Sequence, residues 1–565
     1  MLTPMTTSRT GAEYVVDALD QYGVEHLFGN PGTTELPVVQ SLSDSSIEYV
    51  LGLHEDVAVG MASGYARTRR YHSHHDEDIN PIGVANLHVA PGLAHGVGNV
   101  IGAYFAGSPL LVTAGNHSTD FQHEEPILSG DLEELVRQYT KWSGEVKSVE
   151  ALPTMLRRAV RYALTPPTGP VFLALPLDVM LDETTQEVER LGEIPRAGRG
   201  DLDSIEAAAD AIADATEPVV ITGDEIARSG PDAVEAAVSF AESSGARVHG
   251  EFLPGEVSFP MDHPQWGHYV PGTESQFADL VDTDTVVLAG CSSLTTSIRH
   301  EEPLFSPETT IIQIGMNPRE LGKNRPADVS VIGDPGAVMS ELAAELETRI
   351  SEDERRRRID TVQEAIEHFS EQQRPAEADD DDPRASKGEL GQAMFESASD
   401  AFLVNEGVTS SRAVRWHVPY GTEGKLSNKS GGLGYGLPAA IGAAIAERER
   451  PDPRDVVAFI GDGSYFYYPQ SIYSAVRYDV DLTVIVANNN NYRILKDNTL
   501  RVLGGNEDEH DFVGMDFEPP LNITKNAESY GASSRMVYSP SEIASAIESA
   551  RDQDGTTVLD VLVHD

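Results

Sequence analysis

Two oxygen-bearing side chains between residues 456 and 492 stand where a metal ion could bind. Apolar runs at residues 456–460 and 482–487 predict buried strands, and residues 470–478 predict a helix between them. Asp462 follows the first run and Asn489 follows the second. Parallel strands joined by one crossover helix end at the same edge of a sheet, so these two side chains are expected to lie together. Carboxylate and amide oxygens are ligands that suit Mg²⁺.

Two glycines flank this aspartate. Gly461 and Gly463 would let backbone N–H groups approach an anion at a helix N-terminus. A diphosphate could then share one metal ion with Asp462 and Asn489. The segment lacks the GKS or GKT of a P-loop, and the alternative is an ordinary Gly-Asp-Gly turn.

The GDG motif with the later asparagine run makes the chain resemble the thiamine-diphosphate-dependent decarboxylase and acetolactate synthase superfamily. The resemblance covers essentially the whole chain and implies thiamine diphosphate and Mg²⁺ as cofactors. It implies that the side chains of Asp462 and Asn489 and the backbone carbonyl of Asn491 bind the metal. The residues that it places around the diphosphate are Gly461, Gly463, Ser464 and Tyr492.

A glutamate in EYVLGLHEDVAVGMASGYAR matches the second signature of this superfamily. Glu55 follows a strand predicted at residues 49–53 and begins a helix. In the superfamily this carboxylate bonds the pyrimidine ring and promotes loss of the thiazolium C2 proton, so the resemblance makes Glu55 catalytic. The alternative is an acid at a helix N-terminus that stabilises the helix dipole.

The segment SGGLGYGLPAAIGAAIA is a third match. The resemblance places Gly431 near the aminopyrimidine and makes Leu433 the apolar residue that holds the cofactor in its bent shape. Thr409, in NEGVTSS, is expected to help hold the diphosphate. A Gly-rich turn between a strand and a helix is the alternative for the first two.

Three segments, FGNPGTTELP, NLHVAPG and FPMDHPQWG, look most like benzoylformate decarboxylases. By that resemblance Thr33 holds the substrate carboxylate, and His88 and His263 transfer protons. Imidazoles suit proton transfer near neutral pH, although each could instead be a structural histidine. Ile494 and Asn498 depart from the residues that border the phenyl pocket in that branch, which puts benzoylformate itself in doubt.

The resemblance therefore implies decarboxylation of a 2-oxo acid through an enamine intermediate, with possible carboligase activity. One rival is an acetolactate-synthase-like carboligase that condenses two 2-oxo acids, and another is a non-catalytic subunit that binds thiamine diphosphate. The resemblance also implies a homodimer or homotetramer with active sites at the subunit interface. No convincing flavin motif is present in the central part, so FAD is not expected there.

The charge of the chain limits its partners. The 565 residues include 41 Lys and Arg against 91 Asp and Glu, a formal net charge of −50. Such a surface repels nucleic acids and anionic membranes. Scarce lysine beside this acidic excess favours adaptation to high salt, against an acidic cation-binding surface or an ordinary acidic protein. The single cysteine, the absence of a signal-like opening and the absence of a long apolar stretch indicate a cytoplasmic protein.

Alternation of apolar runs and helical segments predicts an α/β protein with three doubly wound parallel sheets. We expect a pyrimidine-binding domain at residues 1–185, a central domain at 196–350 and a diphosphate-binding domain at 386–565. A charged helix and acidic linker occupy residues 351–385, and the four aspartates at 379–382 mark a boundary. The His-rich YHSHHDED could bind a metal, but a solvated loop is the simpler interpretation.

Overall fold

The computed structural model describes residues 8–271, 277–278, 280–292, 303–373 and 382–565. By its internal contacts the chain forms two compact units. One comprises residues 1–194, 377–417 and 428–565, and the other comprises residues 195–376 and 418–427.

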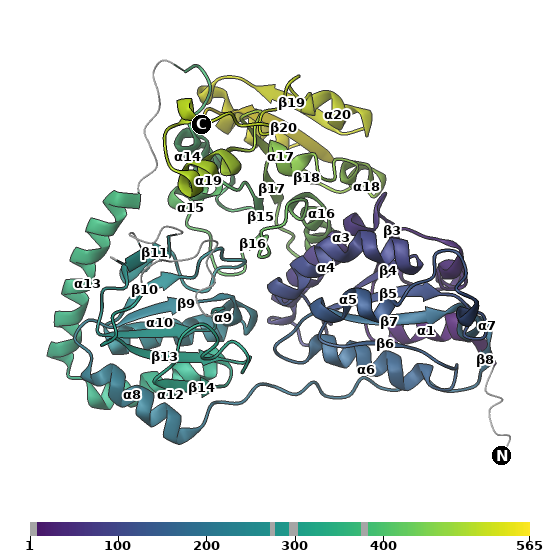
Figure 1. Ribbon diagram of the computed structural model, residues 1–565, viewed down its shortest axis with the longest axis horizontal. Coiled ribbons are helices and arrows are strands. Elements are labelled where there is room, and N and C mark those ends of the chain that lie inside the picture. The colour runs from purple at the N-terminus through teal and green to yellow at the C-terminus, as the bar shows by residue number, and fades with distance from the viewer. Residues whose placement is uncertain (1–7, 272–276, 279, 293–302, 374–381) are drawn as a thin grey trace. The chain divides into compact units, whose positions relative to one another are not determined.

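The N-terminal part of the first unit is a six-stranded parallel sheet in the order β3-β2-β4-β5-β7-β6 (Figure 1). Thr10 and Glu13 form the predicted capping box at the start of α1, which packs on this sheet. The strands and helices of this part are β1 (Arg9–Thr10), α1 (Gly11–Gln21), β2 (His26–Gly29), α2 (Leu36–Ser41), β3 (Glu48–Leu51), α3 (Glu55–Ser73), β4 (Gly83–Leu87), α4 (Val89–Ala106), β5 (Leu110–Asn116), α5 (Leu132–Val136), β6 (Ser143–Glu145), α6 (Leu152–Leu164), β7 (Val171–Pro176), α7 (Leu177–Leu181) and β8 (Glu183–Thr184).

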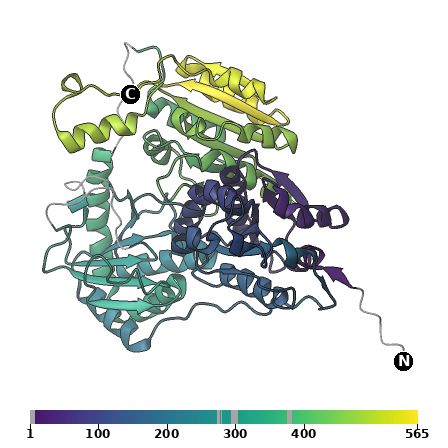
Figure 2. The same ribbon diagram turned by 45° about the vertical axis from the view of Figure 1, so that its right-hand side comes forward.

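The C-terminal part of the same unit holds the GDG motif. Its strands pair in the order β15-β17-β18-β20-β19, with the short β16 as the sixth strand. In Figure 2 the helix α19 and the loop after it, in yellow-green, stand to one side of this sheet. The elements are α14 (Lys387–Ala398), β15 (Phe402–Glu406), α15 (Ser411–His417), β16 (Lys425–Ser427), α16 (Gly436–Arg448), β17 (Val456–Gly461), α17 (Asp462–Tyr465), α18 (Ser471–Arg477), β18 (Leu482–Asn488), α19 (Arg493–Leu503), α20 (Ile523–Ser529), β19 (Ser533–Val537), α21 (Ile543–Arg551) and β20 (Thr556–Leu562).

Helices α3 and α16 join the two halves of this unit through small residues. A Cβ atom on Gly442 would lie 1.9 Å from the carbonyl oxygen of Met61, and one on Gly64 would lie 2.1 Å from that of Ala439. Only glycine permits so close an approach of two helix backbones. This contact fixes the helix that begins at Glu55 against the half that contains the GDG motif.

The second unit contains a third six-stranded parallel sheet, in the order β11-β10-β9-β12-β13-β14. Its apolar core lies between this sheet and α8, α10 and α12. The elements are α8 (Leu202–Asp214), β9 (Val219–Thr222), α9 (Asp224–Arg228), α10 (Pro231–Ser244), β10 (Arg247–Gly250), β11 (Trp266–Tyr269), β12 (Thr285–Ala289), β13 (Thr310–Gly315), β14 (Val329–Ile332), α12 (Pro335–Arg349) and α13 (Glu352–Gln373).

The predicted fold class is confirmed, because the described chain folds around three six-stranded parallel sheets. The domain boundaries stay predictions, and residues 379–381 of the proposed acidic boundary lie outside the described residues. One detail was wrong: the His-rich segment is not wholly a solvated loop. His72 is still in α3, is buried, and its Nε2 lies 3.1 Å from Glu447 Oε1.

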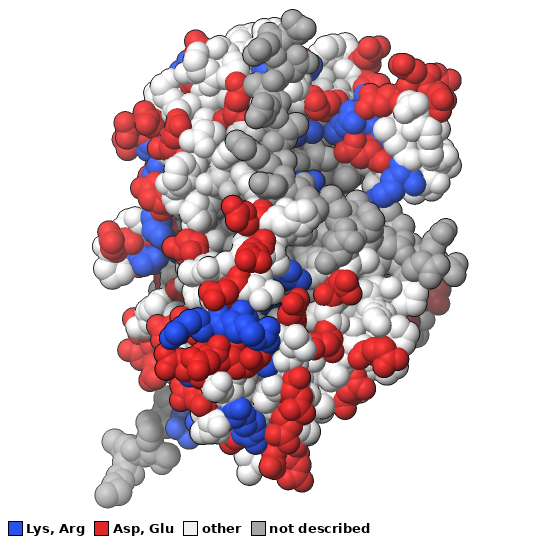
Figure 3. All heavy atoms as spheres, turned by 90° about the vertical axis from the view of Figure 1, so that its left-hand side faces the viewer, with Lys and Arg blue, Asp and Glu red and all other residues white. Residues whose placement is uncertain are grey.

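Acidic side chains are spread over the face shown in Figure 3, with basic side chains gathered among them. In the described parts of the chain, no helix combines the length and apolar character needed to cross a membrane.

Candidate active site

Asp462 begins the short helix α17 directly after β17, at the carboxyl edge of the C-terminal sheet. The residue is buried, and its Oδ1 accepts a hydrogen bond of 2.8 Å from the N–H of Gly463. Its Oδ2 is also buried and has no hydrogen-bond partner among the residues that the structure describes. Burial raises the pKa of Asp462 to about 7. A buried carboxylate oxygen without a partner fits a bound cation, which would supply the missing charge.

The asparagine run lies beside Asp462. Gly461 of β17 is level with Ala487 of β18, and the backbone N–H of Asn490 opposes the rise in the pKa of Asp462. Asn490 has φ +58°, a left-handed conformation that asparagine tolerates better than most residues.

The ring of Tyr492 packs against the GDG motif. A Cβ atom on Gly463 would lie 2.4 Å from Cε1 of Tyr492, so the ring packs directly on the glycine. A Cβ on Gly461 would meet no atom within 4 Å. The Oδ1 of Asn491 is buried without a hydrogen-bond partner in the described chain. Gly461, Asp462, Gly463 and Tyr492 thus lie together at the edge of the sheet where the asparagine run begins, and metal binding by Asp462, Asn489 and Asn491 stays a prediction.

Glu406, at the end of β15, organises the Gly-rich turn that contains Gly431 and Leu433. Its carboxylate accepts hydrogen bonds from the N–H groups of Gly434, at 2.8 Å, and Gly436. Gly431 has φ +76° and no atom within 4 Å of a Cβ built on it, so its backbone borders open space. Burial raises the pKa of Glu406 to about 7.

Glu406 is a partner of the site that the motifs did not predict. The available signal was a carboxylate at the end of the apolar run FLVNE, where a buried acid needs partners. Its backbone oxygen also accepts a 3.4 Å hydrogen bond from the hydroxyl of Ser464. Thr409 is half-buried in the turn that follows the same strand.

Glu55 is the first residue of α3, whose N-terminus is capped by Nδ1 of His54. Its side chain is 13% exposed, and its Oε2 lies 3.3 Å from Nδ1 of His95 on α4. A Cβ on Gly92 would lie 2.9 Å from Glu55 Oε1, so α4 passes close to the carboxylate. Within the described residues, no hydrogen bond or ion pair connects Glu55 with Asp462.

His88 caps the start of α4 and forms a pair with a glutamate that sequence analysis missed. Its Nδ1 lies 2.8 Å from Oε2 of Glu35, which is fully buried. An ionised carboxylate only accepts, so with Glu35 ionised Nδ1 would be the donor of this hydrogen bond. The next residue, Val89, has φ +31°, a strained backbone for a β-branched side chain.

Glu35 is held by other groups around it. Its Oε1 accepts hydrogen bonds from Gly115 N, at 2.8 Å, and from the hydroxyl of Thr34, at 2.7 Å. Thr34 Oγ1 also lies 3.3 Å from His88 Nδ1, whereas Thr33 is exposed. In the sequence, the indication of this cluster was a charged residue, Glu35, within FGNPGTTELP, shortly after the buried strand β2 ends at Gly29.

His263 lies in the second unit. Its Nδ1 accepts a 3.2 Å hydrogen bond from the N–H of Gln265, and its Nε2 lies 3.5 Å from Glu242. Its ring contacts Phe259 edge to face. These contacts hold the turn before β11. The role of His263 in proton transfer stays a prediction.

Three family models match this chain. The N-terminal thiamine pyrophosphate (TPP) binding domain of thiamine pyrophosphate enzymes matches residues 9–140, their central domain matches residues 205–342, and their C-terminal TPP binding domain matches residues 409–561. Together with the fold and the GDG site, these matches show that the chain belongs to the thiamine pyrophosphate enzyme family.

Relatives with different activities resemble the chain to a similar degree. A benzoylformate decarboxylase of Pseudomonas aeruginosa is 26% identical and covers 96% of this chain and 97% of its own. An acetolactate synthase of Bacillus subtilis is 26% identical and covers 98% of this chain and 93% of its own. The solved 4-hydroxybenzoylformate decarboxylase of Rhodococcus jostii RHA1 has a TM-score of 0.83 at 25% identity, and the match covers 98% of this chain and 99% of that one.

Proposed function

We propose that this chain decarboxylates a 2-oxo acid, with thiamine diphosphate and Mg²⁺ as cofactors. The observation that carries the proposal is the buried, unpartnered Oδ2 of Asp462 beside the asparagine run. A cation there would be bound by Asp462, Asn489 and the backbone carbonyl of Asn491. The diphosphate would lie against the N–H groups of Gly461 and Gly463, with Ser464, Thr409 and Tyr492 around it.

The residues near the reacting atoms have separate tasks in this proposal. When bound, thiamine diphosphate would accept the electron pair of the C–C bond that breaks as carbon dioxide is released. Gly431 would lie near the pyrimidine ring, Leu433 would hold the cofactor in its bent shape, and Glu55 would hold a proton at that ring. General acid-base help of this kind contributes roughly 10² to 10⁴ in rate.

His88 is the proposed proton donor and acceptor for the substrate. Glu35 holds the imidazole with Nδ1 protonated, so that Nε2 exchanges the proton. Thr33, which is exposed and precedes this pair in the chain, would bind the substrate carboxylate. His263 is the second proton-transferring residue by the same resemblance.

The active unit is proposed to be a homodimer or a pair of dimers. Helix α4 exposes Pro91, Ala94 and Phe105 along one side, a face without charge. His95, which contacts Glu55, is on this face and is 59% exposed. A second copy seated on this face would bury its apolar area and complete the site around Glu55.

The central sheet gives no support for FAD. Asp224 and Glu251 are buried at the carboxyl ends of β9 and β10, where open α/β sheets bind nucleotides. Both carboxylates are engaged by protein groups, since Asp224 Oδ2 pairs with Arg228 Nη2 at 3.4 Å and Glu251 Oε1 accepts a 2.8 Å hydrogen bond from Asp224 N. We therefore propose thiamine diphosphate and Mg²⁺ as the only cofactors. From its composition we also propose that the enzyme is cytoplasmic and adapted to high salt.

A carboligase is the second candidate, because the acetolactate synthase of Bacillus subtilis is as similar to this chain as the benzoylformate decarboxylase. Incubation with pyruvate separates the two candidates, since acetolactate and acetaldehyde are different products. Cofactor binding without carbon dioxide release from any 2-oxo acid would instead favour a non-catalytic subunit.

The Glu55→Gln variant tests the proposed mechanism. We expect it to bind thiamine diphosphate and Mg²⁺ while its kcat falls by roughly 10² to 10⁴, because the proton on the pyrimidine ring is no longer exchanged. Cofactor binding is measured by calorimetry, and carbon dioxide release is measured with a panel of 2-oxo acids at high and low salt. Near-normal turnover of the variant would contradict the mechanism.

A further inference from the structure

The side chain of Asp565 lies beside the asparagine run. Strands β18 and β20 are parallel neighbours, with Asn488 level with Leu562. The N–H of Val563 then donates a 2.9 Å hydrogen bond to the carbonyl oxygen of Asn488. The residues that follow the two strands therefore run side by side at the edge of the sheet where the cation is proposed.

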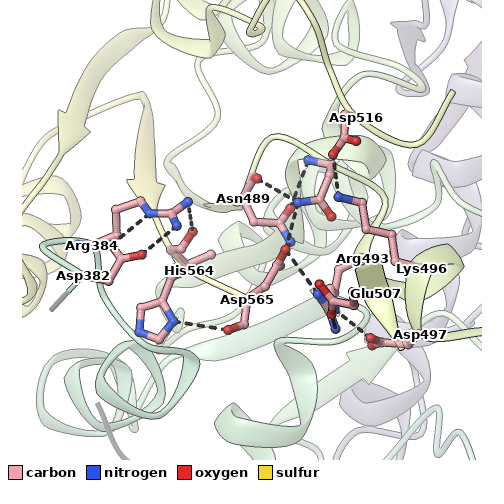
Figure 4. Close-up of polar contacts among 12 residues, drawn as sticks. Asp382, Arg384, Asn489, Arg493, Lys496, Asp497, Glu507, Asp516, His564 and Asp565 are labelled. Atoms are coloured by element: carbon pink, nitrogen blue, oxygen red, sulfur yellow. Dashed lines mark hydrogen bonds and ion pairs between the residues drawn. The ribbon is translucent and has the colours of Figure 1, made fainter. Parts of the chain in front are cut away.

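Asp565 accepts a hydrogen bond from each of two asparagines (Figure 4). Its Oδ1 is 2.6 Å from Nδ2 of Asn489, and its Oδ2 is 3.0 Å from Nδ2 of Asn491. Arg493 Nη1 lies 3.6 Å from the same Oδ2, which places a positive charge beside the carboxylate. One carboxylate thus bridges the two asparagines proposed as ligands.

This bridge decides which way each amide points. An ionised carboxylate accepts hydrogen bonds and donates none, so both NH₂ groups must face Asp565 and both amide oxygens must face away. The Oδ1 of Asn489 then accepts a 3.3 Å hydrogen bond from Asn491 N and keeps a second lone pair. Without Asp565, only the 3.3 Å hydrogen bond from Asn491 N would oppose rotation of the Asn489 amide by half a turn, which would offer an NH₂ group to the cation.

We propose that Asp565 is a positioning residue for the metal site: it selects the amide orientation in which Asn489 presents its oxygen to the cation. The proposal rests on the proposed function, since it takes Asn489 as a ligand. Groups that orient metal ligands in this way change metal affinity when they are removed, by about 10- to 100-fold.

The first test compares two matched variants. Asp565→Asn places an amide opposite two amides, so at least one NH₂ group must turn. Asp497→Asn makes the same change in charge and also alters a partner of Arg493, 2.7 Å away, but it does not touch the asparagines. Binding of Mn²⁺ in the presence of thiamine diphosphate is measured by electron paramagnetic resonance. We expect about 10- to 100-fold weaker binding for Asp565→Asn alone, and binding close to that of the unmodified protein for Asp497→Asn.

The second test separates amide orientation from a general structural effect. In an Asn489→Asp background either oxygen of residue 489 can bind the cation, so orientation no longer matters, and residue 489 instead faces the carboxylate of Asp565 across the 2.6 Å contact. Asp565→Asn removes that repulsion, so we expect it to leave Mn²⁺ binding unchanged or stronger in this background, a non-additive result. The unfolding temperatures of the unmodified protein, of the two single variants Asp565→Asn and Asn489→Asp, and of the double variant, all measured without metal, show whether the fold is intact.

The outcomes separate this proposal from the proposed function. If the unmodified protein binds neither Mn²⁺ nor thiamine diphosphate, the proposed function itself is overturned. If it binds both and Asp565→Asn behaves like Asp497→Asn, or if the loss is the same in both backgrounds, the positioning role is overturned.

Discussion

At the scale of single residues, the most informative groups are buried carboxylates, each with a different set of partners. Asp462 has an oxygen without a partner in the described chain, whereas Glu35 and Glu406 have theirs fully engaged. A buried acid without a partner needs a cation or a proton, and a buried acid with donors around it orients those donors. This difference separates the proposed metal ligand from the residues that hold the site in shape.

The pair of Glu35 and His88 gives a prediction at this scale. Glu35→Gln leaves the side chain almost unchanged in volume but replaces one of its two acceptor oxygens by an NH₂ group, so that either His88 Nδ1 or Gly115 N loses its acceptor. We expect kcat for carbon dioxide release to fall about 10- to 100-fold, with little change in KM. In the double variant Glu35→Gln/His88→Ala, activity should be no lower than in His88→Ala alone. Additive losses would show that Glu35 does not act through His88.

At the scale of elements, the βαβ crossover from β17 to β18 brings the GDG motif and the asparagine run to one edge. The glycines of the motif differ in what surrounds them, since a Cβ at Gly463 meets the ring of Tyr492 and a Cβ at Gly461 meets nothing. The open space at Gly461 is where a diphosphate would approach the backbone.

Alanine at these two glycines therefore gives different expected results. Gly461→Ala should leave the unfolding free energy of the protein without cofactor unchanged, but weaken thiamine diphosphate binding by at least about tenfold, because the methyl group occupies the ligand's space. Gly463→Ala should lower the unfolding free energy by about 1–3 kcal/mol through the contact with Tyr492. Denaturant unfolding and calorimetric titration measure the two quantities. Unchanged affinity in Gly461→Ala would place the diphosphate elsewhere.

At the scale of the whole molecule, the exposed side of α4 and the net charge of −50 govern how the chain meets its surroundings. Phe105, in the last turn of α4, is 48% exposed, and Tyr104 beside it is 37% exposed. In a chain so rich in carboxylates, an uncharged helix face next to Glu55 is a strong indication of an interface.

Phe105→Glu tests this interface. We expect the dissociation constant of the proposed dimer to rise at least about 100-fold, because burying the new carboxylate at the interface is costly. We expect carbon dioxide release to be lost together with the dimer. Tyr162→Glu on α6 is the matched control, because Tyr162 is similarly exposed, at 44%, but lies on another helix. Light scattering after gel filtration gives the mass of each variant in high salt. A dimer that persists in Phe105→Glu would rule out this face as the interface.

The sequence alone was sufficient to predict the fold class and the nearness of the GDG motif to the asparagine run, whose part in metal binding stays a prediction. Apolar runs with helical segments between them can form few structures other than parallel α/β sheets, and the spacing between GDG and the asparagines is set by one crossover. Only the tertiary structure revealed Glu35, Glu406 and Asp565 as partners of the predicted residues. Their contacts join segments far apart in the chain, so side-chain packing, and not local periodicity, determines which donor each carboxylate meets.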